Sequence, residues 1–246
     1  IVTGAAGGIG SAVAAQLARE GANLCLADKR PEIAVAQEIR ALGRTAIEQP
    51  IDVTDSTAVR LMVDRTLEAF GRVDILVNVA GVSSHGSSEQ VTDAEWDRVL
   101  TNNLKSAFLC CRTVIPPMRA QRYGRIVNIG SILGKNGGNP RPWIDRAEQT
   151  RAGNVAYGAS KAGVHMLTMF LAKELAADGI TVNAVAPGPI ASAMTVNFPE
   201  TLRALIPVGR MGQAAEVAEA VCFLASDAAA FITAEILDVN GGMWGD

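Results

Sequence analysis

Short apolar runs alternate with longer amphipathic stretches along the whole chain, and this alternation limits the possible folds more than any other feature. Runs typical of β-strands occupy residues 1–2, 23–27, 45–50, 73–77, 125–129, 180–185 and 235–239. Helical periodicity predicts helices at 9–20, 31–42, 55–70, 92–119, 155–177 and 213–226. Apolar strands that alternate with helices pack as a parallel sheet covered on both faces. We therefore expect an α/β fold, a doubly wound parallel sheet of about seven strands with helices on both faces.

The length and composition suit one domain. The chain has 246 residues, 49% of them hydrophobic, and no linker or break in composition interrupts it, so residues 1–246 are expected to form a single domain. It begins at Ile1 inside the first strand and lacks an initiator Met, so some N-terminal residues of that strand are expected to be missing.

Charge and residue usage exclude several classes of partner. A net charge of −3 argues against a nucleic-acid-binding protein, and no apolar run approaches the roughly 20 residues that a membrane span needs. The four cysteines have neither disulfide nor zinc spacing, so we expect a cytoplasmic protein without a metal site. Of the two histidines, His85 is expected in an exposed loop and His165 as a packing residue on a helix.

A glycine-rich turn, Thr3-Gly-Ala-Ala-Gly-Gly-Ile-Gly10, lies between the first strand and the first helix. Such a turn lets a phosphate approach the free N–H groups of the helix N-terminus, and Asp28 at the end of the second strand is placed to accept from a ribose hydroxyl. This arrangement predicts a Rossmann-type dinucleotide site. A carboxylate repels a 2′-phosphate, which favours NAD over NADP, although the neighbouring Lys29 and Arg30 could reach a phosphate.

Tyr157 and Lys161 share one face of the helix expected at 155–177. An ammonium group near a phenol lowers the phenol pKa toward the neutral range, where it can act as a general acid or base. Taken alone, this spacing is also common on solvated helix faces.

Several motifs occur in an order that resembles the short-chain dehydrogenase/reductase family. They are the glycine-rich turn, Asn78-Val-Ala-Gly81 after the fourth strand, Ser131 after the fifth, Tyr157 with Lys161, and Pro187-Gly188 after the sixth. The resemblance covers essentially the whole chain and ends in a closing strand at residues 232–242.

The resemblance implies roles for individual residues. Tyr157 is implied as the general acid or base and Lys161 as its partner that also holds the nicotinamide ribose. Ser131 is implied to stabilise the substrate oxygen, and Asn103 to support a proton relay through water. The implied cofactor-binding set is Gly4, Gly8, Ile9, Gly10, Asp28, Asp52, Val53, Asn78, Ala80, Gly81, Tyr157, Lys161, Pro187, Gly188, Ile190 and Ser192. The family also commonly forms homotetramers through its long helices and last strand.

This chain departs from the family pattern at three places. Val79 replaces an Asn and Ala234 replaces a Gly, and both changes are expected to be neutral. Ser131 and Tyr157 are 26 positions apart (157 − 131), about twice the usual separation. The excess falls in residues 137–153, which contain Trp143 and three arginines at 141, 146 and 151 and are expected to be irregular. This insertion is expected to reshape the mouth of the pocket or to contact another subunit.

Three functions follow as hypotheses. The first is an NAD-linked oxidoreductase that interconverts a small secondary alcohol and a ketone. The second is an NADPH-dependent 3-oxoacyl-carrier-protein reductase, which Asp28 and the absence of a basic residue in the turn disfavour. The third is a non-catalytic dinucleotide sensor, which predicts the loss of at least one of four residues. All four are present, namely Asn103, Ser131, Tyr157 and Lys161. The identity of the substrate stays open.

Overall fold

Seven parallel strands form one sheet in the computed structural model, which describes residues 1–30, 34–138, 142–192, 195 and 198–245. The strand order is β3-β2-β1-β4-β5-β6-β7, and every neighbouring pair is parallel. The strands are β1 (Val2–Thr3), β2 (Leu24–Asp28), β3 (Ala46–Pro50), β4 (Ile75–Asn78), β5 (Gly124–Ile129), β6 (Ile180–Pro187) and β7 (Ile236–Val239). The predicted α/β fold with its doubly wound parallel sheet is confirmed.

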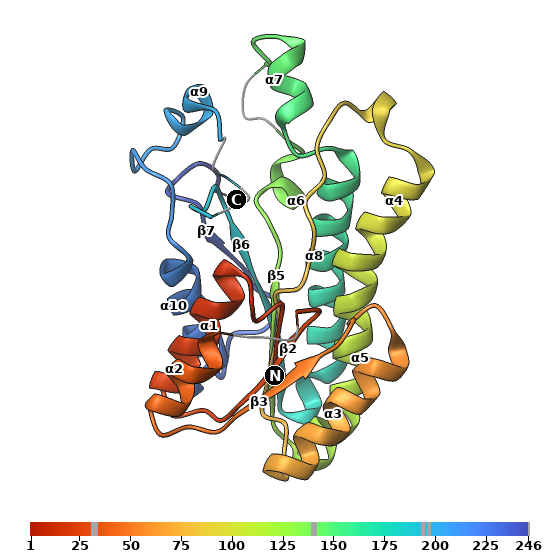
Figure 1. Ribbon diagram of the computed structural model, residues 1–246, viewed down its shortest axis with the longest axis vertical. Helices are drawn as coiled ribbons and strands as arrows, with labels where there is room; N and C mark the ends of the chain where they lie inside the picture. The colour runs from red at the N-terminus through yellow and green to blue at the C-terminus, as the bar shows by residue number, and fades with distance from the viewer. Residues whose placement is uncertain (31–33, 139–141, 193–194, 196–197, 246) are drawn as a thin grey trace.

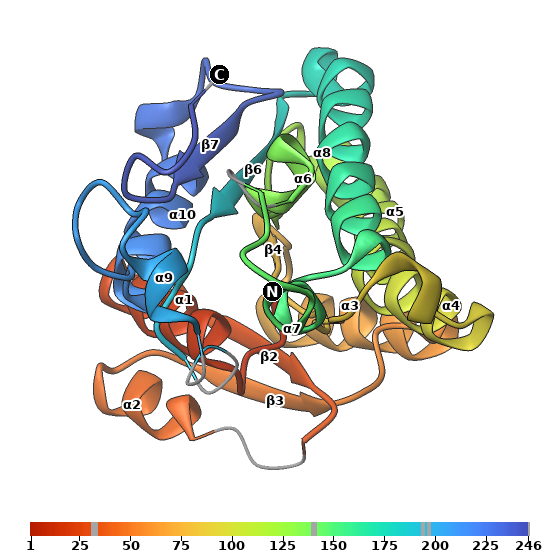
Figure 2. The same ribbon diagram turned by 90° about the horizontal axis from the view of Figure 1, so that it is seen from above.

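The helices cover the two faces of this sheet separately (Figures 1 and 2). One face carries α1 (Gly8–Arg19), α2 (Val35–Ala41) and α10 (Ala214–Ala225), and the other carries α3 (Ser56–Phe70), α4 (Asp93–Leu100), α5 (Ser106–Gln121) and α8 (Val155–Leu175). Each layer has its own apolar core against the sheet. The strands read as nearly continuous apolar runs because both of their faces are buried.

The chain reverses its direction of winding between β1 and β4. Strands β1 to β3 are added toward one edge of the sheet, and β4 to β7 toward the other. Val2 of β1 pairs with Leu26 on one side and with Val77 on the other, so the loops that leave β1 and β4 emerge side by side. In sheets of this kind, ligands bind at the carboxyl ends of the strands where the winding reverses.

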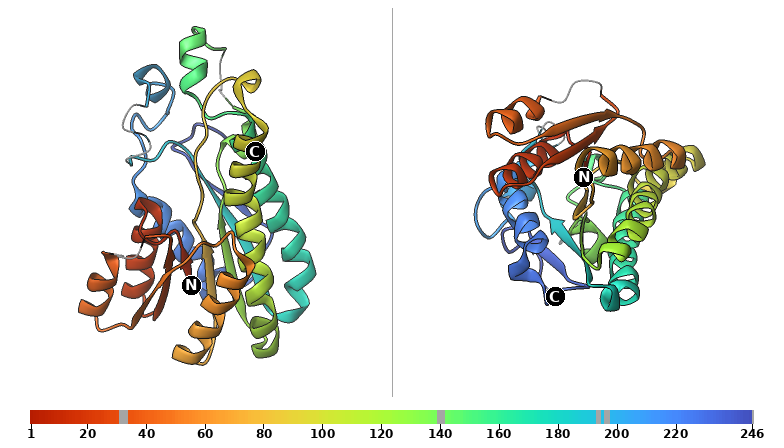
Figure 3. Two further views of the ribbon diagram at one scale, coloured as in Figure 1. Left: turned by 45° about the vertical axis from the view of Figure 1, so that its right-hand side comes forward. Right: turned by 90° about the horizontal axis from the view of Figure 1, so that it is seen from below.

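Short helices lie above this edge. They are α6 (Leu133–Asn136), α7 (Arg146–Arg151) and α9 (Glu200–Arg203), and α7 projects farthest from the sheet, as the green helix at the top of Figure 3 (left) shows. Single 3₁₀ turns occur at η1 (Ser88–Gln90), η3 (Ala176–Asp178) and η5 (Asp227–Ala229).

The structure corrects the prediction that the insertion is irregular, since α7 lies inside it. The Asp145 carboxylate caps this helix by accepting from Glu148 N at 2.7 Å. Such a cap offsets weak helical periodicity in a short segment. Arg141, one of the insertion's arginines, lies outside the described residues.

Two helix boundaries also differ from the predicted ones. The helix expected from residue 92 to 119 contains a π-helical turn, η2 (Thr101–Lys105), between α4 and α5. The described part of the second helix begins at Val35, and Pro31, where its start was expected, lies outside the described residues.

Ala234 has a backbone φ of +68°, in the left-handed region that glycine tolerates best, so its replacement of Gly is not neutral. Ala234→Gly is expected to relieve this strain and raise the free energy of unfolding by about 1 kcal/mol, or the melting temperature by about 2–4 °C. Thermal and urea unfolding measure the change. The control is Ala230→Gly at an ordinary φ of −60°, which should lower stability. Equal effects of the two substitutions would contradict the strain.

Candidate functional site

The glycine-rich turn after β1 packs backbone against backbone. A Cβ added at Gly10 would lie 2.1 Å from the carbonyl oxygen of Gly4, and one added at Gly4 would lie 2.9 Å from the backbone nitrogen of Ala80. Gly8, at the start of α1, has open space where its Cβ would be, and Ile9 follows it in the first turn of the helix. The residues therefore leave an open helix N-terminus, which fits the phosphates of a dinucleotide.

Asp28 lies against this turn at the end of β2. Its carboxylate accepts from Ala6 N at 3.0 Å, from Arg30 N at 3.0 Å and from Arg30 Nε at 3.2 Å. Burial opposes the ionisation of Asp28, but the hydrogen bonds from Arg30 and Ala6 outweigh it and lower the pKa of the carboxyl group below its usual value. An ionised acceptor in this place fits a ribose hydroxyl.

Asp52 follows β3, and its carboxylate is bound by neighbouring side chains. Asp52 Oδ1 accepts from the backbone and the hydroxyl of Thr54, and Asp52 Oδ2 pairs with Lys29 Nζ at 3.1 Å. Val53 beside it is buried. Lys29 and Arg30, the two cations that follow Asp28, are thus each paired with a carboxylate.

The loop after β4 connects the glycine-rich turn to the residues predicted as catalytic. The Thr3 hydroxyl accepts from Val79 N and Ala80 N at 3.1 and 3.2 Å. A Cβ added at Gly81 would lie 3.0 Å from Asn103 Oδ1 and 3.8 Å from Lys161 Nζ. Asn78 is buried at the end of β4, where its Nδ2 donates to Asn128 Oδ1 at 2.8 Å.

The segment after β6 faces the loop after β5. Ile132 N donates to the carbonyl oxygen of Pro187, and Gly188 N donates to that of Val239. Ile190 is buried and forms a bridge with Gly212. The hydroxyls of Ser192 and Thr195 lie 3.3 Å apart.

Ser131, Tyr157 and Lys161 meet at the carboxyl end of β5. The Ser131 side chain lies near enough to the Tyr157 phenol to lower its pKa, and Lys161 Nζ lies 5.8 Å from the centre of the Tyr157 ring. Lys161 Nζ also donates to the Ile129 carbonyl oxygen at 2.7 Å, which fixes the ammonium against the last residue of the strand. The sequence predicted these three as a catalytic group, and the structure brings them together.

The predicted effect of Lys161 on Tyr157 is wrong for this structure. Packing around the phenol raises the pKa of Tyr157, and the nearby Ser131 side chain only partly opposes this. Burial also lowers the pKa of Lys161 to about 8, because it penalises the charged form of an amine. The sequence predicted the charge and its spacing from the phenol, but not the dehydration of both groups.

Asn103 lies in the π-helical turn and is 2% exposed. Its Oδ1 accepts from Val82 N at 2.7 Å, and its Nδ2 donates to Val82 O at 3.0 Å and to Ser160 Oγ at 2.9 Å. The side chain therefore joins the loop after β4 to α8, next to Lys161.

Two polar side chains at the site were missed by the sequence analysis. His165, expected to be a packing residue, accepts from Ser131 N through Nε2 at 3.3 Å, and its place one turn beyond Lys161 could have indicated this. Asn154 is the N-cap of α8 and accepts from Tyr157 N through Oδ1 at 3.2 Å. An Asn directly before the predicted helix is the usual signal for a cap.

The insertion between Ser131 and Tyr157 is tied to both sides of the site. Arg146 pairs with Glu89 of η1, and Glu148, which is 3% exposed, accepts from the Thr201 hydroxyl of α9 at 3.0 Å. Figure 2 shows α7 and α9 above the sheet in the view onto its carboxyl end. A reshaped pocket mouth and a contact with another subunit both stay predictions for this segment.

Two absences apply to the described residues. No cluster of three or more His, Cys, Asp or Glu side chains in them could hold a metal ion. None of the helices formed by these residues has the length and apolar character needed to cross a membrane.

Lys161→Met is expected to stabilise the protein at pH 7 while removing a group of the site. Burial lowers the pKa of Lys161 from 10.5 to about 8, so at pH 7 the folded wild type carries the full cost of a buried ammonium. The lost hydrogen bond to Ile129 offsets part of the gain, leaving about 2 kcal/mol. Above pH 8 the Lys161 ammonium loses its proton in the folded protein but keeps it in the unfolded chain. The free energy of unfolding of the wild type should therefore rise toward that of Lys161→Met. Urea unfolding of both proteins at about pH 7 and pH 9.5 measures it, and a pH-independent gap would contradict the assignment.

Comparisons with known proteins show the family of the chain. A family model described as enoyl-(acyl carrier protein) reductase matches residues 4–244. A 3-oxoacyl-acyl-carrier-protein reductase of Staphylococcus aureus (strain Mu50) is 41% identical, with 99% of this chain and 97% of the relative covered. Proteins with the same name from Escherichia coli K12 and Thermotoga maritima are 38% and 37% identical, with 99% of this chain and 96% of each relative covered. The chain belongs to the short-chain dehydrogenase/reductase family and is an NAD(P)-dependent oxidoreductase.

Proposed function

We propose that this protein reduces the ketone of a 3-oxoacyl thioester to the corresponding secondary alcohol. The observation that carries the proposal is the grouping of Tyr157 with two buried residues, Ser131 and Lys161, in which Lys161 Nζ lies 5.8 Å from the centre of the Tyr157 ring. The relatives at 37–41% identity, named for reduction of 3-oxoacyl groups on acyl-carrier protein, support this substrate class. Of the two enzymatic hypotheses drawn from the sequence, the comparisons favour the reaction of the second, which is the reduction of a 3-oxoacyl group.

The Ser131 and Tyr157 hydroxyls suit a carbonyl oxygen. A ketone oxygen between them would accept from Ser131 Oγ and from the Tyr157 hydroxyl, both aimed at the atom on which negative charge develops. A bound nicotinamide supplies the hydride. Because packing raises its pKa, Tyr157 is protonated at neutral pH and is ready to act as the acid. The ammonium of Lys161 then stabilises the tyrosinate that remains, and the Asn103 side chain holds the neighbouring loop against α8.

Tyr157→Phe is expected to lower kcat for reduction of acetoacetyl-CoA by roughly 10³-fold, since it removes the proton donor. Oxidation of NADH and NADPH followed by absorbance at steady state measures the loss. Crotonyl-CoA, which offers a carbon–carbon double bond in place of the ketone, should be a poor substrate.

The other hypotheses predict different outcomes. Equal rates for the wild type and Tyr157→Phe would support a non-catalytic dinucleotide sensor. Turnover of simple secondary alcohols with NAD, but not of acetoacetyl-CoA, would support the first enzymatic hypothesis. Preferred turnover of crotonyl-CoA would overturn the assignment of the reaction to a ketone.

We further propose that NAD(H) is preferred over NADP(H). The support is the ionised Asp28, whose side chain is 11% exposed and lies against the glycine-rich turn. Among the described residues, Arg30 is the only cationic side chain in contact with Asp28. Its guanidinium lies 3.9 Å from where a Cβ on Gly7 would be. A 2′-phosphate would have to separate this pair, whereas a ribose hydroxyl can donate to the carboxylate.

Asp28→Ala and Arg30→Ala are expected to change the cofactor preference in opposite directions. Without the carboxylate, the ratio of the Kd values for NADPH and NADH should fall toward one, and without the arginine it should rise by on the order of tenfold. Fluorescence titration with each dinucleotide measures both ratios. Tighter binding of NADPH by the wild type, or a fall of the ratio in Arg30→Ala, would contradict the proposal.

Assembly and location stay proposals. Apolar side chains on α5 and α8 are exposed, among them Phe108 (41%), Met166 (54%) and Phe170 (70%), and they support the predicted homotetramer as a surface for other copies. The four cysteines are buried free thiols, which supports a reducing, cytoplasmic setting.

A further inference from the structure

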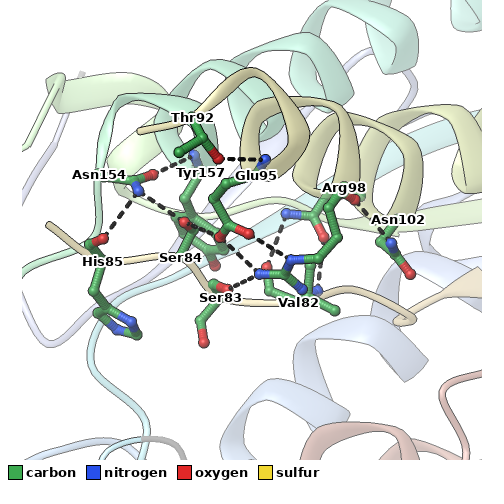
Figure 4. Close-up of polar contacts among 11 residues, drawn as sticks. Val82, Ser83, Ser84, His85, Thr92, Glu95, Arg98, Asn102, Asn154 and Tyr157 are labelled. Atoms are coloured by element: carbon green, nitrogen blue, oxygen red, sulfur yellow. Dashed lines mark hydrogen bonds and ion pairs between the residues drawn. The ribbon is translucent and has the colours of Figure 1, made fainter. Parts of the chain in front are cut away.

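A chain of hydrogen bonds runs from the first turn of α8 to α4 (Figure 4). Tyr157 N donates to Asn154 Oδ1, and Asn154 Nδ2 donates to Ser84 Oγ at 2.7 Å. The Ser84 hydroxyl donates to Glu95 Oε1. Arg98 closes the chain by donating to Glu95 through Nε at 2.6 Å and Nη2 at 2.8 Å.

Each hydrogen bond in this series has a fixed donor and a fixed acceptor. Asn154 Nδ2 also donates to the His85 carbonyl oxygen at 3.1 Å, so the amide cannot be turned over without placing its oxygen against another acceptor. The Ser84 hydroxyl accepts from Asn154, and its single proton is left for Glu95. Hydrogen bonds from Arg98 and Ser84 hold the pKa of Glu95 at about 2, so it stays ionised and acts only as an acceptor at neutral pH.

The same contacts fix the loop that carries the chain. Asn103 binds both the N–H and the carbonyl of Val82, Arg98 Nη2 donates to Ser83 O, and Asn154 N donates to Ser84 O at 3.0 Å. Ser84 and Asn154 are 4% and 6% exposed. Buried polar groups joined in this way are rigid, because each loses a partner if another moves.

We propose that Asn154 and Ser84 are positioning residues, which set the place of the Tyr157 phenol by anchoring the first turn of α8 to Glu95 on α4. The proposal rests on the proposed function, in which Tyr157 is the proton donor. Asn154 reaches Tyr157 through the backbone nitrogen of that residue, and this leaves the phenol itself free to face Ser131. Small displacements of a reacting group cost rate more than they cost binding.

Two substitutions separate this role from simple helix capping. Asn154→Asp keeps an acceptor for Tyr157 N, and Asp is a good N-cap, but it replaces the donor to Ser84 and His85 with a carboxylate oxygen. Ser84→Ala leaves the cap intact and removes the link to Glu95. The control is Thr66→Val, which deletes another buried hydroxyl that donates within α3, to the carbonyl oxygen of Met62 at 2.7 Å.

The chain has only two tyrosines, Tyr123 and Tyr157, so 3-fluorotyrosine labelling gives two ¹⁹F resonances, which Tyr157→Phe assigns. In Asn154→Asp and Ser84→Ala we expect the Tyr157 resonance and its titration midpoint to shift, and the Tyr123 resonance to stay. We also expect kcat with acetoacetyl-CoA to fall roughly tenfold while the Kd for the dinucleotide is unchanged. Thr66→Val should lower the melting temperature alone.

An unchanged Tyr157 resonance and an unchanged kcat in both variants would overturn the positioning role. The same holds if rate losses follow the melting temperature in all three variants. Equal rates for the wild type and Tyr157→Phe would instead reject the proposed function, and the ¹⁹F shifts, which need no substrate, would still test whether Asn154 and Ser84 place the phenol.

Discussion

The side-by-side pairing of β1 and β4 is the constraint on which the site depends. It brings the glycine-rich turn and the loop after β4 together, and the Thr3 hydroxyl holds that loop by its first two backbone N–H groups. From there, the loop is bound by Asn103 and then by Asn154 at the start of α8. One short stretch of backbone therefore joins the glycine-rich turn to the group formed by Ser131, Tyr157 and Lys161. A change in that pairing would alter the spacing of both ends at once.

Stability and chemistry oppose each other at the end of β5. Lys161 is 5% exposed, and its pKa of about 8 records the cost of keeping an ammonium there. The same dehydration raises the pKa of Tyr157. A poorly solvated charge acts more strongly on an anion that forms beside it. The burial of the Lys161 ammonium, which lowers the stability of the fold, would therefore strengthen its interaction with a tyrosinate at Tyr157. Natural proteins commonly sacrifice some stability in this way at functional sites.

Much of the fold, and which side chains lie together at the candidate site, could be predicted from the sequence. Strand and helix periodicity predicted the seven strands, and strand-end motifs predicted which side chains would meet, because parallel strands end at one edge. The errors concern properties that depend on tertiary surroundings. The direction of the Tyr157 pKa depends on packing, and the contact of His165 with Ser131 depends on how α8 lies on β5. The helix α7 depends on a local cap, and the strain at Ala234 on a backbone angle that composition does not reveal.

The insertion that contains α7 leaves and rejoins the site at two fixed points. On one side, Leu133 N donates to Ser131 Oγ, and on the other, Gly153 bridges His85 while Asn154 binds Ser84. Because both junctions are held by contacts outside the insertion, the chain between them can change in length and composition without moving the Ser131 and Tyr157 hydroxyls. The insertion is thus structurally separate from the Ser131 and Tyr157 side chains that it lies above. We therefore expect that this segment can be exchanged, by evolution or by grafting, with little effect on the positions of the Ser131 and Tyr157 side chains.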